Sequence, residues 1–145
     1  MMRSHTKFVF AAFLTTAVYG QDWKIIPTAI PDIDFSIDIS SIERRENLVT
    51  FRERLVFQKA DRIDPVSGKH IHQKRTHRIM DCKEKTQGLL AGSMIDDSGK
   101  LIEMVNFDKD QIDMTDIPKG TIAEQEFDMV CVVVPNNTNS ATQKP

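Results

Sequence analysis

Cysteine is scarce in this sequence: the 145 residues contain only two. Two thiols are too few for a four-cysteine zinc site or for the dense disulfide network of a small cysteine-rich domain. An excess of basic residues is also missing, because 19 lysines and arginines stand against 21 aspartates and glutamates and give a formal charge of −2. A nucleic-acid-binding protein, which usually has a strongly basic surface, is therefore not expected.

Sequence motifs of catalysis and metal binding are missing as well. The chain has no Gly-x-Ser-x-Gly elbow, no phosphate-binding glycine loop and no His-Glu-x-x-His pair. The segment 106–117 starts with the spacing of a calcium loop, but Gln111 replaces the required glycine and Ile117 the required glutamate. We therefore expect a protein that is not an enzyme and that has no metal and no cofactor.

Long apolar runs are limited to one, the eleven residues 8–18 near the start of the chain. Arg3 and Lys7 precede this run and Gly20 follows it, which is the layout of a secretory signal peptide. A retained membrane anchor would need roughly 20 apolar residues in a helix; an internal core helix is the remaining alternative. We expect a signal peptide over 1–20, a folded domain over 21–134 and a disordered tail over 135–145.

The signal peptide sets the expected location of the mature chain. Neither Gln21 nor Asp22 is a cysteine, so the new N-terminus would lack a site for lipid attachment. No later apolar run has the length of a membrane span. The mature protein is thus expected to be exported and either periplasmic or extracellular, without a lipid anchor.

Alternation of apolar and polar residues predicts several short strands. The clearest is 48–59, whose two faces differ in polarity except at Glu53 and Val56. One face carries Val49, Phe51, Leu55 and Phe57, and the other carries Thr50, Arg52, Arg54 and Gln58. Further strands are expected at 23–26, 34–37, 70–82, 87–96 and 100–107, with a polar turn over 43–47 and a hairpin turn over 96–99.

The pattern changes to a helical period near the end of the chain. Thr121 stands three residues before Glu124, which is the spacing of a capping box at the start of a helix. The next apolar positions share one helical face: Ala123, Phe127, Val130 and Cys131. Antiparallel strands with one late helix of about ten residues define an α+β domain, in which the helix buries its apolar face against the sheet.

The two cysteines favour a structural disulfide. Cys82 ends a predicted strand, Cys131 lies on the predicted helix, and disulfides persist in an exported protein. Such a bond would close a loop of about 50 residues and stabilise the fold by roughly 4 kcal/mol in the chain-entropy estimate. The alternative is a reactive thiol pair, which usually requires Cys-x-x-Cys spacing or a nearby base.

Several short motifs follow one another in order over Trp23 to Cys131. They are Trp23, the segment 38–42, Arg45, Asn47, Val49, Phe51, the segment 81–83, the segment 119–124 and the pair Val130 and Cys131. With these motifs the chain is similar to the surface-adhesin protein E family of exported bacterial proteins. The resemblance implies an antiparallel sheet of about six strands, a C-terminal helix tied to it by a disulfide, and attachment to host extracellular-matrix proteins. The chain departs from the family in lacking a lipid-attachment cysteine.

Basic and histidine residues are concentrated in one segment, 69–78. Its histidines do not form a set of zinc ligands, because His70 and His72 share one face of a strand and His77 has the other. The segment is typical of a surface that binds an acidic polysaccharide or protein, or of a solvent-facing or edge strand. We take as candidate partner-binding residues Lys69, His70, His72, Lys74, Arg75, His77 and Arg78.

Together these observations predict an exported, non-enzymatic binding domain of the bacterial cell envelope. It would bind through an exposed face of the sheet or through the segment 69–78. The partner would be a protein or an acidic polysaccharide, and the sequence leaves a homodimer open. The alternative is a soluble periplasmic accessory or structural protein with no adhesive role.

Overall fold

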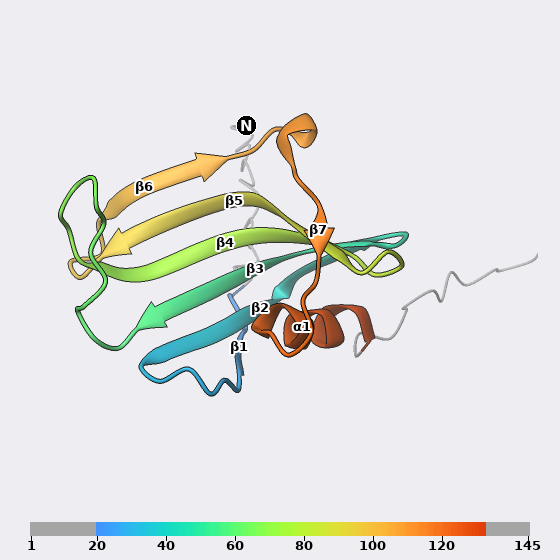
Figure 1. Ribbon diagram of the computed structural model, residues 1–145, viewed down its shortest axis with the longest axis horizontal. Helices are drawn as coiled ribbons and strands as arrows, with labels where there is room; N and C mark the ends of the chain where they lie inside the picture. Colours follow the sequence, from blue (N-terminus) through green and yellow to red (C-terminus); the bar gives the residue numbers. More distant parts are fainter. Residues whose placement is uncertain (1–19, 133–145) are drawn as a thin grey trace, which may run out of the picture.

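The computed structural model describes residues 20–132 of the chain (Figure 1). Apart from Gly20, the expected signal peptide lies outside the described residues, and so does the expected tail over 135–145. Within 20–132, no helix is both long and apolar enough to cross a membrane.

Six strands follow one another in space in the same order as along the chain, and each pairs antiparallel with the next (Figure 1). This order confirms the predicted α+β fold with an antiparallel sheet of about six strands. A two-residue strand, β7 (Thr115–Asp116), pairs separately with β5. The six strands are β1 (Trp23–Ile26), β2 (Ile33–Arg45), β3 (Leu48–Phe57), β4 (Ile71–Asp81), β5 (Thr86–Asp96) and β6 (Leu101–Asn106).

Strand β2 is longer than predicted, and the polar turn expected over 43–47 is correspondingly shorter. Glu43 and Arg44 pair with Thr50 and Val49 of β3, so only Glu46 and Asn47 form the turn. A register shift between Asp38 and Glu43 marks a bulge in β2. The polar sequence hides the strand because one side of β2 is solvated at this end, where backbone pairing with β3 maintains the extended chain.

One face of the sheet forms the core with the C-terminal helix. The α-helix α1 (Ile122–Phe127) continues into a π-helical turn, η2 (Asp128–Val132). Thr121 caps α1, as predicted, because its hydroxyl accepts a hydrogen bond from the backbone N–H of Glu124. The buried apolar cluster contains Ile26, Phe35, Ile37, Val49, Phe51, Met80 and Val130.

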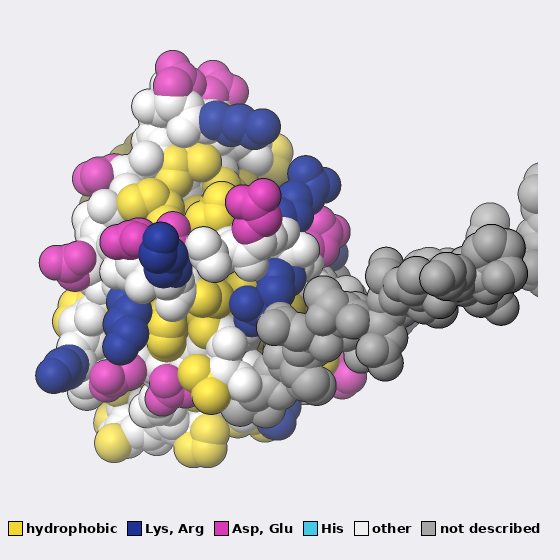
Figure 2. Space-filling view, turned by 90° about the vertical axis from the view of Figure 1, so that its right-hand side faces the viewer, with side chains coloured by type: hydrophobic (Ala, Val, Ile, Leu, Met, Phe, Trp, Pro, Cys, Tyr) yellow, Lys and Arg dark blue, Asp and Glu magenta, His cyan; other side chains and the backbone are white. Residues whose placement is uncertain are grey.

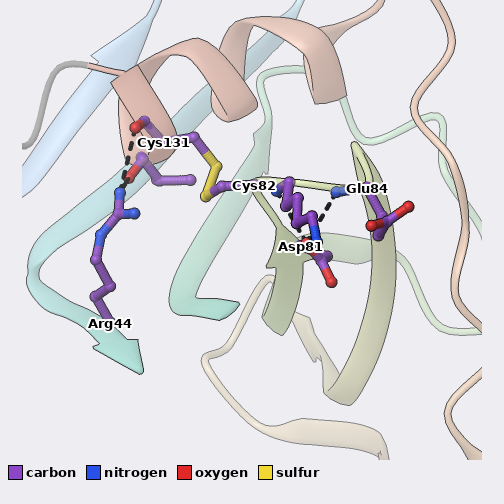
Figure 3. Close-up of a disulfide and its surroundings, with 7 residues drawn as sticks. Arg44, Asp81, Cys82, Glu84 and Cys131 are labelled. Atoms are coloured by element: carbon purple, nitrogen blue, oxygen red, sulfur yellow. Dashed lines mark hydrogen bonds between the residues drawn. A yellow bond between two sulfur atoms is a disulfide. The ribbon is translucent and has the colours of Figure 1, made fainter. Parts of the chain in front are cut away.

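A disulfide joins Cys82 and Cys131, with 5.6 Å between the Cα atoms, and confirms the predicted pair (Figure 3). Cys82 follows directly after β4, and Cys131 lies in η2. Beside the bond, Nη2 of Arg44 donates to the carbonyl oxygens of Val130 (3.1 Å) and Cys131 (3.2 Å) (Figure 3). The end of the helical segment is therefore fixed to the sheet by a covalent bond and by hydrogen bonds from β2.

Candidate functional site

The face of the sheet opposite α1 carries a group of arginines. Side chains alternate along β3, so Phe51 and Glu53 are buried on the helix side while Arg52, between them, is exposed on the opposite side. We call this opposite side the open face, because neither α1 nor η2 packs on it. It is defined by Trp23 of β1, Arg52 and Arg54 of β3, and Arg75 and His77 of β4.

The register between β3 and β4 places two arginines directly opposite one another and a histidine opposite a third. Arg54 pairs with Arg75, and Arg52 pairs with His77. Like charges at directly opposed positions of an antiparallel pair destabilise the sheet. Local violations of the rules for stability tend to occur at functional sites, so this pairing makes the open face a candidate binding site.

Neighbouring side chains hold Arg54 in place, and a buried acid lies near Arg52. The guanidinium carbon of Arg54 lies 4.3 Å from the centroid of the Trp23 ring, which is a cation–π contact, and its Nε donates to Oγ of Ser36 at 3.3 Å. Asp38 of β2 is in register with Arg52. Burial alone would raise the pKa of Asp38, but hydrogen bonds from Ser40 and Asp22, with the charge of Arg52, lower this pKa below its usual value.

Two adjoining hollows cross the open face and meet at His77. The first has a volume of about 160 Å³ and is lined by Trp23, Arg52, Arg75 and Met104, whose side chain is 61% exposed. The second has a volume of about 460 Å³, and its apolar lining includes Ile79 and Leu90. Two basic residues and one acidic residue also line it. Because the hollows share His77, we treat them as one trough. The polar residues of its second part are Glu43, Arg45, Thr50 and Lys109.

His77 is the titratable group at the centre of the trough. Its burial and the adjacent Arg52 lower the pKa of the imidazole, while Glu43 opposes this shift. His77 is therefore kept neutral at pH 7, and acid conditions or a bound anion would favour its protonation. The fixed positive charge of the face comes from the arginines.

The structure divides the predicted binding segment between several environments. Lys69 and His70 precede β4, and Nδ1 of the exposed His72 lies 4.0 Å from a carboxylate oxygen of Asp97. Lys74 and Arg78 alternate with the open-face residues and lie on the helix side of β4. Strand β4 is an inner strand between β3 and β5, so the edge-strand interpretation of this segment was wrong. The structure brings together on the open face only Arg75 and His77 of the predicted set.

Metal binding finds no geometric support in the part of the chain that the structure describes. Among residues 20–132, no three histidine, cysteine, aspartate or glutamate side chains converge in a way that could hold a metal ion.

The end of the molecule nearest α1 and β7 carries charges of both signs around apolar side chains (Figure 2). This end therefore lacks a grouping of arginines like that on the open face.

Arg78 is committed to an internal ion pair. Its Nη1 lies 3.3 Å from Oε2 of Glu53 and 3.2 Å from Oε2 of Glu126, and Thr76 donates a 2.8 Å hydrogen bond to the same oxygen of Glu53. Glu126 is 0% exposed. Its burial, followed by the charge of Glu53, raises the pKa of Glu126 to about 8, although Arg78 acts in the opposite direction. The two buried carboxyl groups therefore share the guanidinium of Arg78, and Glu126 retains its proton at neutral pH.

Sequence reasoning missed this buried group. Glu53 was visible only as a break in the apolar alternation of its strand, at the position where it now faces Arg78. Glu126 is three residues after Ala123 and four before Val130, which places it on the apolar face of the helix. A glutamate on that face was the available signal for a buried carboxyl group.

Replacing Glu126 by glutamine will remove a pH dependence of stability. Because the folded state raises the pKa of Glu126 from 4.5 to about 8, the wild type retains its full stability below pH 4.5 and loses this contribution as the pH rises toward 8. Glu126→Gln, which mimics the protonated form, should be more stable than the wild type at pH 8 by on the order of 2–4 kcal/mol, with little difference at pH 4.5. Urea unfolding between these pH values measures the difference; parallel pH profiles would contradict the assignment.

The chain matches a family model and is similar to several solved structures. The family model of surface-adhesin protein E matches residues 23–132. Among solved structures, the chain is similar to Haemophilus influenzae protein E, with 16% identity, 67% of this chain and 76% of that chain covered, and a TM-score of 0.49. It is also similar to protein E from non-typeable Haemophilus influenzae, with 14% identity, coverage of 77% and 85%, and a TM-score of 0.48. No curated protein sequence matches the chain significantly.

Proposed function

Since the chain belongs to the surface-adhesin protein E family, we propose that it is an exported, non-enzymatic binding domain that attaches the bacterial cell to extracellular matrix. The contact surface in this proposal is the open face of the sheet. The family match supports an adhesin-like surface protein, and the matrix partner and the face are the new parts of the proposal.

The observation that carries the choice of face is the cross-strand pairing of Arg54 with Arg75 and of Arg52 with His77. The three arginines occupy one side of the sheet in a chain whose formal net charge is −2, so positive charge is concentrated there rather than spread evenly. A localised field of this kind attracts a partner of opposite charge and speeds its association. On the other large face, the part formed by β1 to β4 is occupied by the core.

Loss of two open-face arginines will weaken attachment to matrix. The double variant Arg52→Gln/Arg75→Gln removes the two exposed guanidiniums without touching the core. Charge-assisted contacts contribute a large binding free energy, so the affinity for an immobilised basement-membrane extract should fall by about tenfold or more. Surface plasmon resonance with the purified exported chain measures this loss.

A matched control comes from lysines away from the open face. Lys74 is the neighbour of Arg75 on the helix side of β4, and Lys100 lies in the hairpin between β5 and β6. The double variant Lys74→Gln/Lys100→Gln removes the same charge, and its matrix binding should stay within about twofold of the wild type. Equal losses in the two double variants would rule out the open face as the specific contact.

A further inference from the structure

We propose that the open face binds a sulfated polysaccharide chain of the matrix, with the trough as its binding site; this inference rests on the proposed function and names the chemistry of its partner. Three arginines of the open face form a compact array: Arg52 and Arg75 line the first hollow of the trough, and Arg54 lies beside them. Arg52 and Arg54 are two residues apart on one face of β3, and Arg75 lies directly across from Arg54. Strand geometry spaces such positions by roughly 5–7 Å.

Guanidinium groups suit sulfate and carboxylate ligands. Each guanidinium presents N–H donors in a planar fork that can bind two oxygens of one oxyanion, whereas an ammonium acts as a point charge. The Trp23 ring and Ser36 restrain Arg54, which reduces the entropy lost when it binds. An array of such guanidinium forks, one of them restrained, therefore favours a polymer that carries a regular series of oxyanions.

The second hollow extends the site beyond the arginine array. Arg45 and Lys109 are at its rim, and Leu48, Ile79 and Leu90 line it. Cations at the rim can bind further sulfates, while an aliphatic floor can contact the hydrocarbon faces of sugar rings. A linear chain lying along the trough would meet both parts, with His77 between them.

The acids near the trough compensate only part of its positive charge. Glu53 lines the first hollow, but its carboxylate contacts Thr76 and Arg78 on the helix side. Asp38 is buried and accepts hydrogen bonds from Asp22 and Ser40. Glu43 is the one carboxylate that lines the second hollow, and two cations line it as well.

Two other classes of partner fit the trough less well. A single-stranded nucleic acid usually stacks its bases on exposed aromatic rings, and the ring of Trp23 is already in contact with Arg54. A protein partner usually inserts apolar or aromatic anchors into desolvated pockets. The first hollow is lined by the guanidinium groups of Arg52 and Arg75 instead, which favours the polysaccharide.

Immobilised heparin is the direct probe of this inference. The exported chain should bind heparin, and affinity should fall by about tenfold or more when salt is raised from about 0.1 M to about 0.5 M. Arg52→Gln/Arg75→Gln should weaken binding at least about tenfold, and Lys74→Gln/Lys100→Gln less than about twofold. The wild type should bind desulfated heparin as weakly as the arginine variant binds heparin. Equal affinity of the wild type for the sulfated and desulfated chains would overturn the inference, and so would tighter binding of single-stranded DNA.

Matrix treated with heparin lyases separates this inference from the proposed function. Loss of binding after lyase treatment supports both the polysaccharide partner and matrix attachment. Binding that resists the lyases but still requires Arg52 and Arg75 keeps the proposed function and overturns the polysaccharide partner. Heparin binding through the open face without any binding to untreated matrix supports the ligand chemistry and overturns matrix attachment. Thermal unfolding of both double variants verifies that they are folded.

Discussion

Replacing Cys82 and Cys131 by alanine will lower the free energy of unfolding by about 4 kcal/mol. The disulfide closes a loop whose ends are 49 residues apart in sequence, and the main effect of removing it is a larger conformational freedom of the unfolded chain. A domain of this size has a net stability of about 5–15 kcal/mol, so the loss is a large share of the total. The double variant should thus be only marginally folded at elevated temperature.

Urea unfolding with and without a reductant measures the contribution of the disulfide. Reductant should destabilise the wild type to the level of Cys82→Ala/Cys131→Ala and leave the variant unchanged. The hydrogen bonds from Arg44 to the carbonyls of Val130 and Cys131 remain in both proteins, so they do not contribute to the difference. A variant within about 1 kcal/mol of the wild type would contradict a structural role for the bond.

Replacing Arg78 by methionine will destabilise the fold by about 3–5 kcal/mol, because it leaves the carboxyl groups of Glu53 and Glu126 buried without their cation. Breaking a buried ion pair costs more than replacing the whole group, since an uncompensated charge stays behind. The triple variant Glu53→Gln/Arg78→Met/Glu126→Gln should therefore recover much of the loss. Chemical unfolding at pH 7 gives both values.

Arg75 provides the control for Arg78. The two arginines are three residues apart on β4, but Arg75 is exposed on the open face and opposite Arg54. Arg75→Met should change the free energy of unfolding by less than about 1 kcal/mol, and loss of the repulsion from Arg54 favours a small gain. If Arg78→Met were as mild as Arg75→Met, or if the triple variant were no better than the single one, the buried group would not have the role assigned to it.

The topology could be predicted from the sequence because consecutive strands pair with one another. Alternation in β3 and the turn at Asp96–Gly99 depend on local residues, and both agree with the structure. The start of the helix could also be predicted from local residues, because Thr121 and Glu124 form its cap. The long β2 strand was underestimated because its polar end is stabilised by pairing with β3, which local polarity does not reveal.

The candidate site could be predicted only in part. Alternation placed Arg52 and Arg54 on the polar face of one strand, and the basic segment contained Arg75 and His77. Their convergence depends on the register between β3 and β4, which is set by the loop that joins these strands and by packing across the core. The burial of Arg78 depends on Glu126 in α1, a contact between distant parts of the chain that no local pattern encodes.

The most direct test of the account is adhesion of intact bacterial cells to basement-membrane extract. Cells producing the wild type, Arg52→Gln/Arg75→Gln or Lys74→Gln/Lys100→Gln would be compared with a deletion strain, and the surface amount of each protein measured by protease digestion of intact cells. The account predicts that all three proteins are digested and that only the arginine variant falls to the retention of the deletion strain. Adhesion independent of Arg52 and Arg75, or protection of the protein until the outer membrane is opened, would contradict it and favour a periplasmic accessory role.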